Sequence, residues 1–316
     1  MIVQNQIVEA GGLDKRLKLL YGDDPVELKK QKGRYAALIR IFNQEFPGER
    51  AIEIFSTPGR TEVGGNHTDH NAGRVLAAAV DLDIVAVVSP NQDGVIRIRS
   101  GKFPAVTVNT DELDVVESEK FSPTALVRGI CARLGQLGYQ IGGFDAFTTS
   151  NVPNGAGLSS SAAFEVLVVT ILNHLFNDGS IDDVLNAQIA QYAENVYFGK
   201  PCGLMDQTTC AVGGLVTIDF KDFKNPVVHK VGFDFAAQGF SVVIVAVGGD
   251  HADLNDDYIA LENEMKSTAR ALGGQVLREF SKEILFQNLG AVRAQVSDRG
   301  ILRAIHFYND DQRVVD

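Results

Sequence analysis

A loop rich in glycine and serine, NVPNGAGLSSS at residues 151–161, has the composition of a phosphate-binding turn. Gly155 and Gly157 let the backbone turn sharply and come close to a ligand. The serines at 159–161 stand where a helix is predicted to begin, and there free N–H groups and the helix dipole favour an anion. Capping of that helix alone would explain only one serine. We therefore predict that this loop binds a nucleotide triphosphate.

A second loop, residues 58–73, is dense in charged and polar groups for so glycine-rich a segment. Carboxylate, imidazole and amide groups can each pair with adjacent hydroxyls, so one hypothesis is a polyol site. Another hypothesis is a metal site formed by His67, Asp69 and His70, and a third is a solvated turn without function. The groups concerned are Arg60, Glu62, Asn66, His67, Asp69 and His70.

Two carboxylates, those of Glu194 and Asp206, flank the segment GKPCGL. Asp206 follows a Pro-Cys-Gly turn, which predicts a fixed position for it. Glu194 is expected in the last turns of a helix that ends at Gly199, where the helix dipole disfavours a carboxylate unless a cation such as Mg²⁺ compensates. Taken alone, the pair is more simply a solvated helix residue and a turn residue. With the two loops, it supplies what phosphoryl transfer to a sugar requires: a Mg²⁺ site, a cation and a carboxylate beside the attacking hydroxyl.

Composition and charge limit the classes of function. With 316 residues and 45% apolar side chains, the chain can bury a sizeable core in one large domain or two ordinary ones. A net charge of −11 argues against nucleic acid as a partner. No apolar run is long enough to predict a membrane span, and the first residues lack the apolar segment of a signal peptide. Three cysteines without metal-ligand spacing indicate a reducing compartment, so we expect a cytoplasmic protein. We also expect it to act as a monomer.

The elements that must position these groups follow from hydrophobic periodicity and from helix and turn signals. Residues 144–150 alternate as a strand, and residues 162–176 are apolar on nearly every face, as expected of a helix inside a core. Further helices are predicted at 25–46, 122–135 and 181–198, and strands at 51–56, 74–88, 95–99 and 215–220.

A polar stretch with a proline, residues 221–226, predicts a domain boundary. Beyond it we predict a buried strand at 241–247 and helices at 256–272 and 281–296. A domain built from residues 227–316 alone would be short of strands, so we expect the C-terminal domain to be incomplete in this chain.

Four segments resemble the GHMP kinase family and, within it, the galactokinases. They are PGRTEVGGNHTDHNAGRVL at 58–76, NVPNGAGLSSSAA at 151–163, GKPCGLMDQ at 199–207 and GGDHADLNDDY at 248–258. The first and third motifs are specific to galactokinase-like members. The resemblance implies an α+β fold of two domains, 1–224 and 225–316, with the active site in the cleft between them.

The resemblance also implies a role for each residue of these clusters. Asp206 would accept the proton of the sugar C1 hydroxyl or orient that hydroxyl, and Arg60 would stabilise charge on Asp206 and on the transferred phosphoryl group. The sugar would be bound by Asn66, His67, Asp69, Gly203 and Tyr258. ATP would be bound by Gly155, Ala156, Gly157, Leu158, Ser159, Ser160 and Ser161, and Mg²⁺ by Ser161 and Glu194.

The activity implied by the resemblance is ATP-dependent phosphorylation of α-D-galactose at C1. The sequence departs from the family pattern at Asn66, where a glutamate is usual, and at His70, where a tyrosine is usual. An amide lacks the charge-assisted strength of a carboxylate toward a hydroxyl, and the Gly-rich third motif near the C-terminus is missing. Alternatives are therefore a kinase for N-acetylgalactosamine or galacturonate, and a galactokinase-like regulator that binds sugar and ATP without turnover. The presence of both Arg60 and Asp206 argues against such a regulator.

Overall fold

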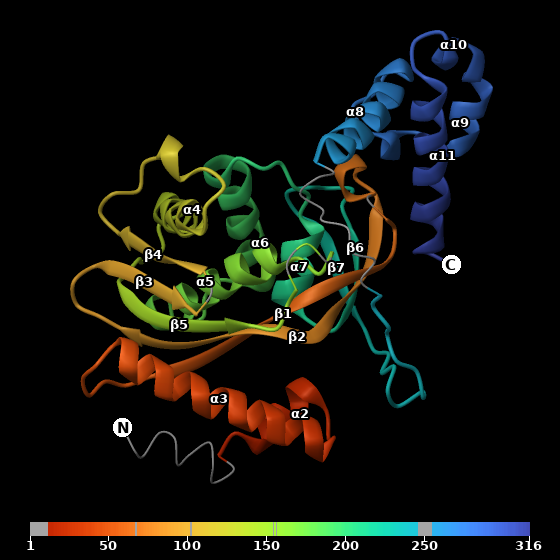
Figure 1. Cartoon of the computed structure of the whole chain (residues 1–316). Coiled ribbons are helices and arrows are strands. Elements are labelled where there is room, and N and C mark those ends of the chain that lie inside the picture. The colour runs from red at the N-terminus through yellow and green to blue at the C-terminus, as the bar shows by residue number, and fades with distance from the viewer. Residues whose placement is uncertain (1–11, 67, 102, 154, 156, 246–254) are drawn as a thin grey trace. The chain divides into compact units, whose positions relative to one another are not determined.

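The computed structural model describes residues 12–66, 68–101, 103–153, 155, 157–245 and 255–316, with the backbone alone at 255, 256 and 258. These residues form an α+β fold whose sheet has the strand order β4-β3-β5-β2-β6-β7, with β1 also paired to β2 (Figure 1). The chain divides into two compact units. The first unit is Met1–Gly59, Asp81–Val152 and Ser160–Cys202, and the second unit is Arg60–Val80, Pro153–Ser159 and Gly203–Asp316. The boundary between residues 224 and 225 stays a prediction.

The first unit is built around β5 (Phe144–Ser150). This strand runs antiparallel to the second half of β2 (Arg74–Pro90), in the register Ile84↔Ser150 to Pro90↔Phe144. On its other side it is parallel to β3 (Val95–Ser100), which pairs antiparallel with β4 (Phe103–Asn109). The predicted strands at 144–150 and 95–99 are confirmed. The apolar run that begins at Arg74 forms one long strand, and its second half is apolar on both faces because helices cover both faces of the sheet there.

Two N-terminal helices, α2 (Asp14–Tyr21) and α3 (Pro25–Glu45), cover one face of this part of the sheet (Figure 1). Helix α3 begins where the sequence predicts, because the Asp24 side chain accepts a hydrogen bond from the Val26 N–H and proline occupies the first turn. The apolar side of both helices packs on β2 and β5. The buried cluster comprises Leu17, Tyr21, Tyr35, Leu38, Ile39, Phe42, Phe46, Val85, Val87 and Phe147.

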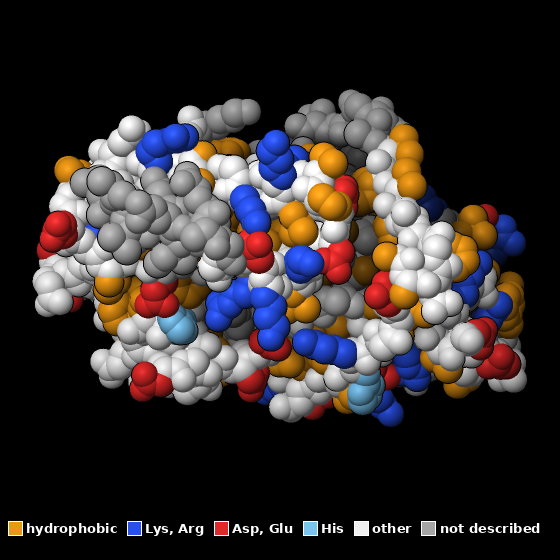
Figure 2. All heavy atoms as spheres, turned by 90° about the horizontal axis from the view of Figure 1, so that it is seen from below, with side chains coloured by type: hydrophobic (Ala, Val, Ile, Leu, Met, Phe, Trp, Pro, Cys, Tyr) orange, Lys and Arg blue, Asp and Glu red, His pale blue; other side chains and the backbone are white. Residues whose placement is uncertain are grey.

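The outward side of α3 is basic, although the chain as a whole is acidic. Figure 2, which views the molecule from this side, shows Lys and Arg side chains gathered over the helix. Exposed basic residues of α3 are Lys29, Lys30 and Arg40. The helix is therefore amphipathic, with an apolar stripe toward the sheet and a solvated basic stripe away from it.

The opposite face of the sheet in the first unit is covered by α4 (Pro123–Gln136), α5 (Ser160–Phe176) and α6 (Asp183–Tyr192) (Figure 1). Helix α5 is buried along most of its length and contacts both α4 and α6, as predicted for a helix that is apolar on nearly every face. The helix predicted at 181–198 is α6 followed by a π-helical turn, Ala193–Phe198, which ends at Gly199 with φ +89°.

A buried carboxylate, Asp83 of β2, ties the N-terminal helices to the sheet within the first unit. Its Oδ2 accepts hydrogen bonds from the Tyr21 hydroxyl and the Ser56 hydroxyl, each at 2.5 Å. Its Oδ1 accepts from Arg34 Nη1 at 2.6 Å. Burial, and then the charge of Asp83, raise the pKa of the Tyr21 phenol, so this group remains a hydrogen-bond donor. The charges of Asp83 and Arg34 are shielded from water by packing, and their mutual pairing and hydrogen bonds offset the cost of that burial.

The second unit contains the first half of β2, with β6 (Leu215–Asp219) antiparallel to it from Arg74↔Asp219 to Ala78↔Leu215. Strand β7 (Val227–Val231) pairs antiparallel with β6. A short helix, α7 (Met205–Val212), precedes β6 and packs on it. The strand predicted at 215–220 is thus confirmed.

The C-terminal part of the second unit is helical and has a core of its own. Its elements are α8 (Asn255–Ala271), η5 (Leu277–Glu279), α9 (Lys282–Gln287), α10 (Leu289–Arg293) and α11 (Asp298–Arg313). The buried side chains shared by these helices are Met265, Ala269, Leu277, Leu285, Val292, Ile301, Ala304 and Phe307. The helix predicted at 256–272 is confirmed as α8.

Three predictions of local structure were wrong. The predicted strand at 241–247 is irregular and exposed at 241–245, since no strand in the described part of the chain lies beside it, and residues 246 and 247 fall outside that part. The helix predicted at 281–296 is two short helices, because Asn288 leaves helical geometry between them. Strand β1 (Glu53–Gly64) continues into residues assigned to a loop, and its Pro58 is tolerated because β1 pairs with β2 alone.

Among the helices that the structure describes, none combines the length and the apolar character needed to cross a membrane.

We expect Asp83→Ala to lower the free energy of unfolding by about 3–5 kcal/mol, since it leaves the buried Arg34 guanidinium without its carboxylate. Urea denaturation measures this loss. Asp81→Ala is the matched control, because this carboxylate lies two residues away on the same strand and is exposed; a change within about 0.5 kcal/mol is expected there. Equal effects of the two substitutions would contradict the structural role of Asp83.

Candidate active site

Arg60 of β1 and Asp206 of α7 form a two-point ion pair in the second unit. Arg60 Nε donates to Asp206 Oδ1 at 2.8 Å, and Arg60 Nη2 donates to Oδ2 at 2.5 Å. Asp206 lies in the first turn of α7, where the helix dipole favours a carboxylate. The guanidinium is 13% exposed and the carboxylate 33%, so the pair is shielded but still open to a ligand on the carboxylate side.

The glycine- and serine-rich loop is hydrogen-bonded to both members of this ion pair. Arg60 Nη1 donates to the Gly157 carbonyl oxygen at 2.5 Å, and the Arg60 backbone N–H donates to the Leu158 carbonyl oxygen at 3.1 Å. The Ser159 hydroxyl donates to Asp206 Oδ2. Gly157 and Ser159 have φ of +71° and +53°, and this left-handed geometry favours glycine, so at Ser159 the loop holds a strained backbone. The structure therefore brings together the loop, the arginine and the carboxylate that the sequence singles out.

The charge of Arg60 is fixed by its surroundings. Burial by itself would lower the pKa of the guanidinium, but the charge of Asp206 and its hydrogen bonds outweigh burial and raise the pKa above its ordinary value. Arg60 is therefore a permanent cation next to a carboxylate and a serine hydroxyl. This combination can stabilise negative charge that develops on a transferred group.

The polar loop after β1 places Asp69 against Gly203. A side chain on Gly203 would put its Cβ 1.8 Å from Asp69 Oδ2, so the close approach depends on glycine at this position. Asp69 is 8% exposed and opens a short 3₁₀ turn, Asp69–Asn71. The imidazole of His70 lies beside it, with Nδ1 3.6 Å from Asp69 Oδ1. Asn66, three residues earlier, is exposed.

Three further residues with predicted roles belong to the first unit. Ser160 and Ser161 open α5. Glu194 lies in the π-helical turn and is 3% exposed, with Lys200 Nζ 3.7 Å from its Oε1. Single π-helical turns are frequent at functional sites. A carboxylate and a serine hydroxyl are oxygen donors of the kind that Mg²⁺ takes, so the residue types fit a magnesium ion.

Some predicted site residues lie outside the described part of the structure: His67, Ala156 and the side chain of Tyr258. Gly155 is described, with φ +68°. Among the described residues, no three His, Cys, Asp or Glu side chains gather as a metal site would require. Because His67 is not among them, the metal site predicted from His67, Asp69 and His70 is left untested.

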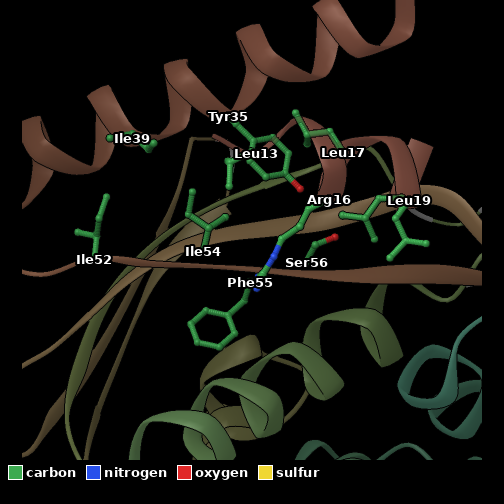
Figure 3. Close-up of a pocket in the computed structure, with 11 residues that line it drawn as sticks. Leu13, Arg16, Leu17, Leu19, Tyr35, Ile39, Ile52, Ile54, Phe55 and Ser56 are labelled. Carbon is green, nitrogen blue, oxygen red and sulfur yellow. The ribbon is translucent and has the colours of Figure 1, made fainter. Parts of the chain in front are cut away.

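A cavity of about 560 Å³ lies elsewhere, between α2, α3 and β1 of the first unit (Figure 3). Its walls are mainly aliphatic, and Arg16 extends from α2 across it toward β1. None of the predicted site residues lines this cavity. It is therefore separate from the candidate active site.

Comparison with family models and solved structures identifies the fold family of this chain. The model "GHMP kinases N terminal domain" matches residues 125–214, and the model "Galactokinase galactose-binding signature" matches residues 40–90. The solved structure of Lactococcus lactis galactokinase complexed with galactose has a TM-score of 0.74 at 23% identity, over 89% of this chain and 72% of that one. Methanococcus jannaschii mevalonate kinase has a TM-score of 0.51 at 18% identity, over 79% and 80%. The fold is that of the GHMP kinases, as predicted.

The curated proteins most useful for naming a family within this fold are galactokinases. The galactokinase of Streptomyces coelicolor is 32% identical over 276 residues, which cover 86% of this chain and 69% of that protein. Human galactokinase is 31% identical over 282 residues, covering 87% and 69%, and that of Clostridium tetani is 28% identical over 291 residues, covering 91% and 70%. The chain belongs to the galactokinase family.

We expect Gly203→Ala to lower the free energy of unfolding by about 1–3 kcal/mol, because the new methyl group collides with the Asp69 carboxylate. Urea denaturation measures the loss. Gly232→Ala is the control, since an added Cβ there meets no atom within 4 Å. In an Asp69→Ala background the Gly203→Ala substitution should cost less, because the clash is gone, and an equal cost in both backgrounds would contradict this account.

Proposed function

We propose that this chain transfers the γ-phosphoryl group of ATP to the C1 hydroxyl of α-D-galactose, giving galactose 1-phosphate and ADP. The observation that carries the proposal is the Asp206 carboxylate, held by Arg60 and by Ser159 of the phosphate-type loop. A carboxylate, a permanent cation and a nucleotide loop in direct contact are what phosphoryl transfer to a hydroxyl needs. Membership of the galactokinase family supports galactose as the acceptor.

In the proposed reaction, the sugar C1 oxygen attacks the γ-phosphorus, the bond to the β-phosphate oxygen breaks, and ADP leaves. Asp206 accepts the proton of the attacking hydroxyl or orients that hydroxyl. Arg60 holds Asp206 in place through two hydrogen bonds and stabilises negative charge on the transferred group. Little covalent chemistry falls to the protein, so the main contributions are position and charge.

The remaining roles are proposals of the same kind. Ser161 and Glu194 would hold Mg²⁺, which neutralises phosphate charge when it is bound. The sugar hydroxyls would be bound by Asn66, His67, Asp69, Gly203 and Tyr258. The nucleotide phosphates would be bound by the loop Gly155, Ala156, Gly157, Leu158, Ser159, Ser160 and Ser161.

One observation favours a second acceptor. Asn66 replaces the usual glutamate of the signature, and its side chain is exposed, so the sugar meets an amide instead of a carboxylate at this point. A neutral amide repels an anionic sugar less than a carboxylate does. Galacturonate, the anionic alternative, therefore belongs in the substrate panel beside galactose, with N-acetylgalactosamine as the neutral alternative.

We expect Asp206→Asn to lower kcat about 100-fold to 10,000-fold, which is the usual contribution of a positioned base, with little change in ATP affinity. ADP release with galactose and Mg²⁺ measures turnover, and equilibrium titration measures ATP binding. Asp222→Asn, a substitution at an exposed turn, is the control. Unchanged turnover in Asp206→Asn would remove the proposed mechanism.

We expect Glu194→Gln to raise the Mg²⁺ concentration needed for half-maximal activity, because an amide is a weaker ligand for a hard cation than a carboxylate. A Mg²⁺ titration at saturating ATP and galactose measures this. Lys200→Met is the matched control: it removes the ammonium group near Glu194 but keeps the carboxylate. Identical titrations for wild type and Glu194→Gln would count against the ligand role.

A further inference from the structure

Helix α11 holds both ends of the loop that carries the proposed sugar contacts, residues 65–74. At one end, Asp310 Oδ2 accepts a hydrogen bond from the Asn66 N–H at 2.5 Å. At the other end, Asp311 Oδ1 accepts from the Arg74 N–H at 2.6 Å. One turn earlier on the helix, His306 Nε2 lies 3.1 Å from the Asn66 carbonyl oxygen. Adjacent carboxylates of one helix thus anchor backbone groups eight residues apart.

Asp311 is itself fixed by a network with three other charged side chains. Arg74 Nη1 and Arg278 Nη1 donate to its Oδ2 at 2.9 and 2.6 Å. The same two arginines donate to Asp219 Oδ2, each at 3.0 Å. Because Arg74 and Asp219 also face each other in the β2–β6 register, the network joins α11 to the sheet of the second unit. Asp310 and Asp311 are 6% and 9% exposed, so these bonds are largely shielded from water.

The described residues inside the loop, which exclude residue 67, make several contacts of their own. The Thr68 hydroxyl donates to the Gly65 carbonyl oxygen at 2.9 Å. Asn71 Oδ1 accepts from the Leu277 N–H at 3.2 Å. Gly65 has φ +80°, and a Cβ there would lie 2.2 Å from the Arg74 carbonyl oxygen. The loop is therefore compact, and the α11 carboxylates set how the compact loop is attached.

We propose that Asp310 and Asp311 are positioning residues for sugar binding, an inference that rests on the proposed galactose kinase activity. They touch no reacting group. They hold the backbone from which Asn66 and Asp69 project, and the exposed Asn66 side chain depends on that backbone for its direction. A hydrogen bond to a charged acceptor contributes enough that losing one should weaken sugar binding about tenfold or more. Nucleotide binding uses other residues and should be unaffected.

The decisive variant is Asp310→Ala. We expect KM for galactose to rise about tenfold or more, while KM for ATP stays within about twofold. Asp310→Asn should restore a near-normal KM, because the amide oxygen can still accept from the Asn66 N–H. Asn309→Ala is the matched control, since Asn309 is exposed on the same helix and bonds to Lys282 instead of the loop. His306→Ala, at an exposed side chain, should raise KM for galactose about twofold to fivefold.

A second measurement does not depend on turnover. Hydrogen–deuterium exchange of the ligand-free protein should show faster uptake across residues 65–74 in Asp310→Ala than in wild type or Asn309→Ala. Unchanged uptake, a galactose KM within twofold of wild type, or an equal rise in both KM values would each overturn the inference. If wild type fails to phosphorylate galactose, the proposed function fails, and the exchange measurement alone then decides whether α11 holds the loop.

Discussion

The ion pair between Arg60 and Asp206 is the interaction on which the candidate site depends. Arg60 is nearly buried, and removing a charge from water is costly unless a partner compensates. Losing Asp206 would leave the shielded guanidinium without a carboxylate, which is costly for a charge removed from water. The same guanidinium also contacts the Gly157 carbonyl oxygen, so it fixes the loop as well as the carboxylate. One side chain thus joins three segments that are far apart in sequence.

The sequence predicts the parts of the site that depend on local patterns. The glycines and serines at 155–161 sit before a helix that is apolar on nearly every face, and such a helix can only be buried. The carboxylates Glu194 and Asp206 stand beside a Pro-Cys-Gly turn, which is also a local signal. The sequence does not predict which segments form hydrogen-bonded strand pairs. The apolar run at 241–245 has the periodicity of a buried strand, yet it is exposed because no described strand lies beside it.

Helix α11 is a second case in which contacts between distant segments could not be predicted from the sequence. Its signals were present: Ser297 caps the first turn, and Ile301, Ala304 and Phe307 recur at helical spacing. Its charges could not be interpreted, however, since two adjacent aspartates near a helix end ordinarily indicate a solvated face. Their partners lie more than 200 residues earlier in the chain, at Asn66 and Arg74. We predicted no helix at 298–313, so this element was missed although its local signals are present, and no local pattern indicates its contacts.

The segments around the Arg60–Asp206 ion pair form a closed path through the second unit. Strand β1 carries Arg60 and leads into the loop that presents Asn66 and Asp69. The loop returns along β2, whose first residue pairs with the last residue of β6, and β6 follows the helix that carries Asp206. The ion pair between Asp206 and Arg60 then completes the path. Because every link is a backbone segment or a hydrogen bond, a shift of the loop at 65–74 would be transmitted toward the ion pair between Arg60 and Asp206. A closed path of this kind supplies the fixed positions that phosphoryl transfer requires, and α11 holds it from outside at the loop, its least regular segment.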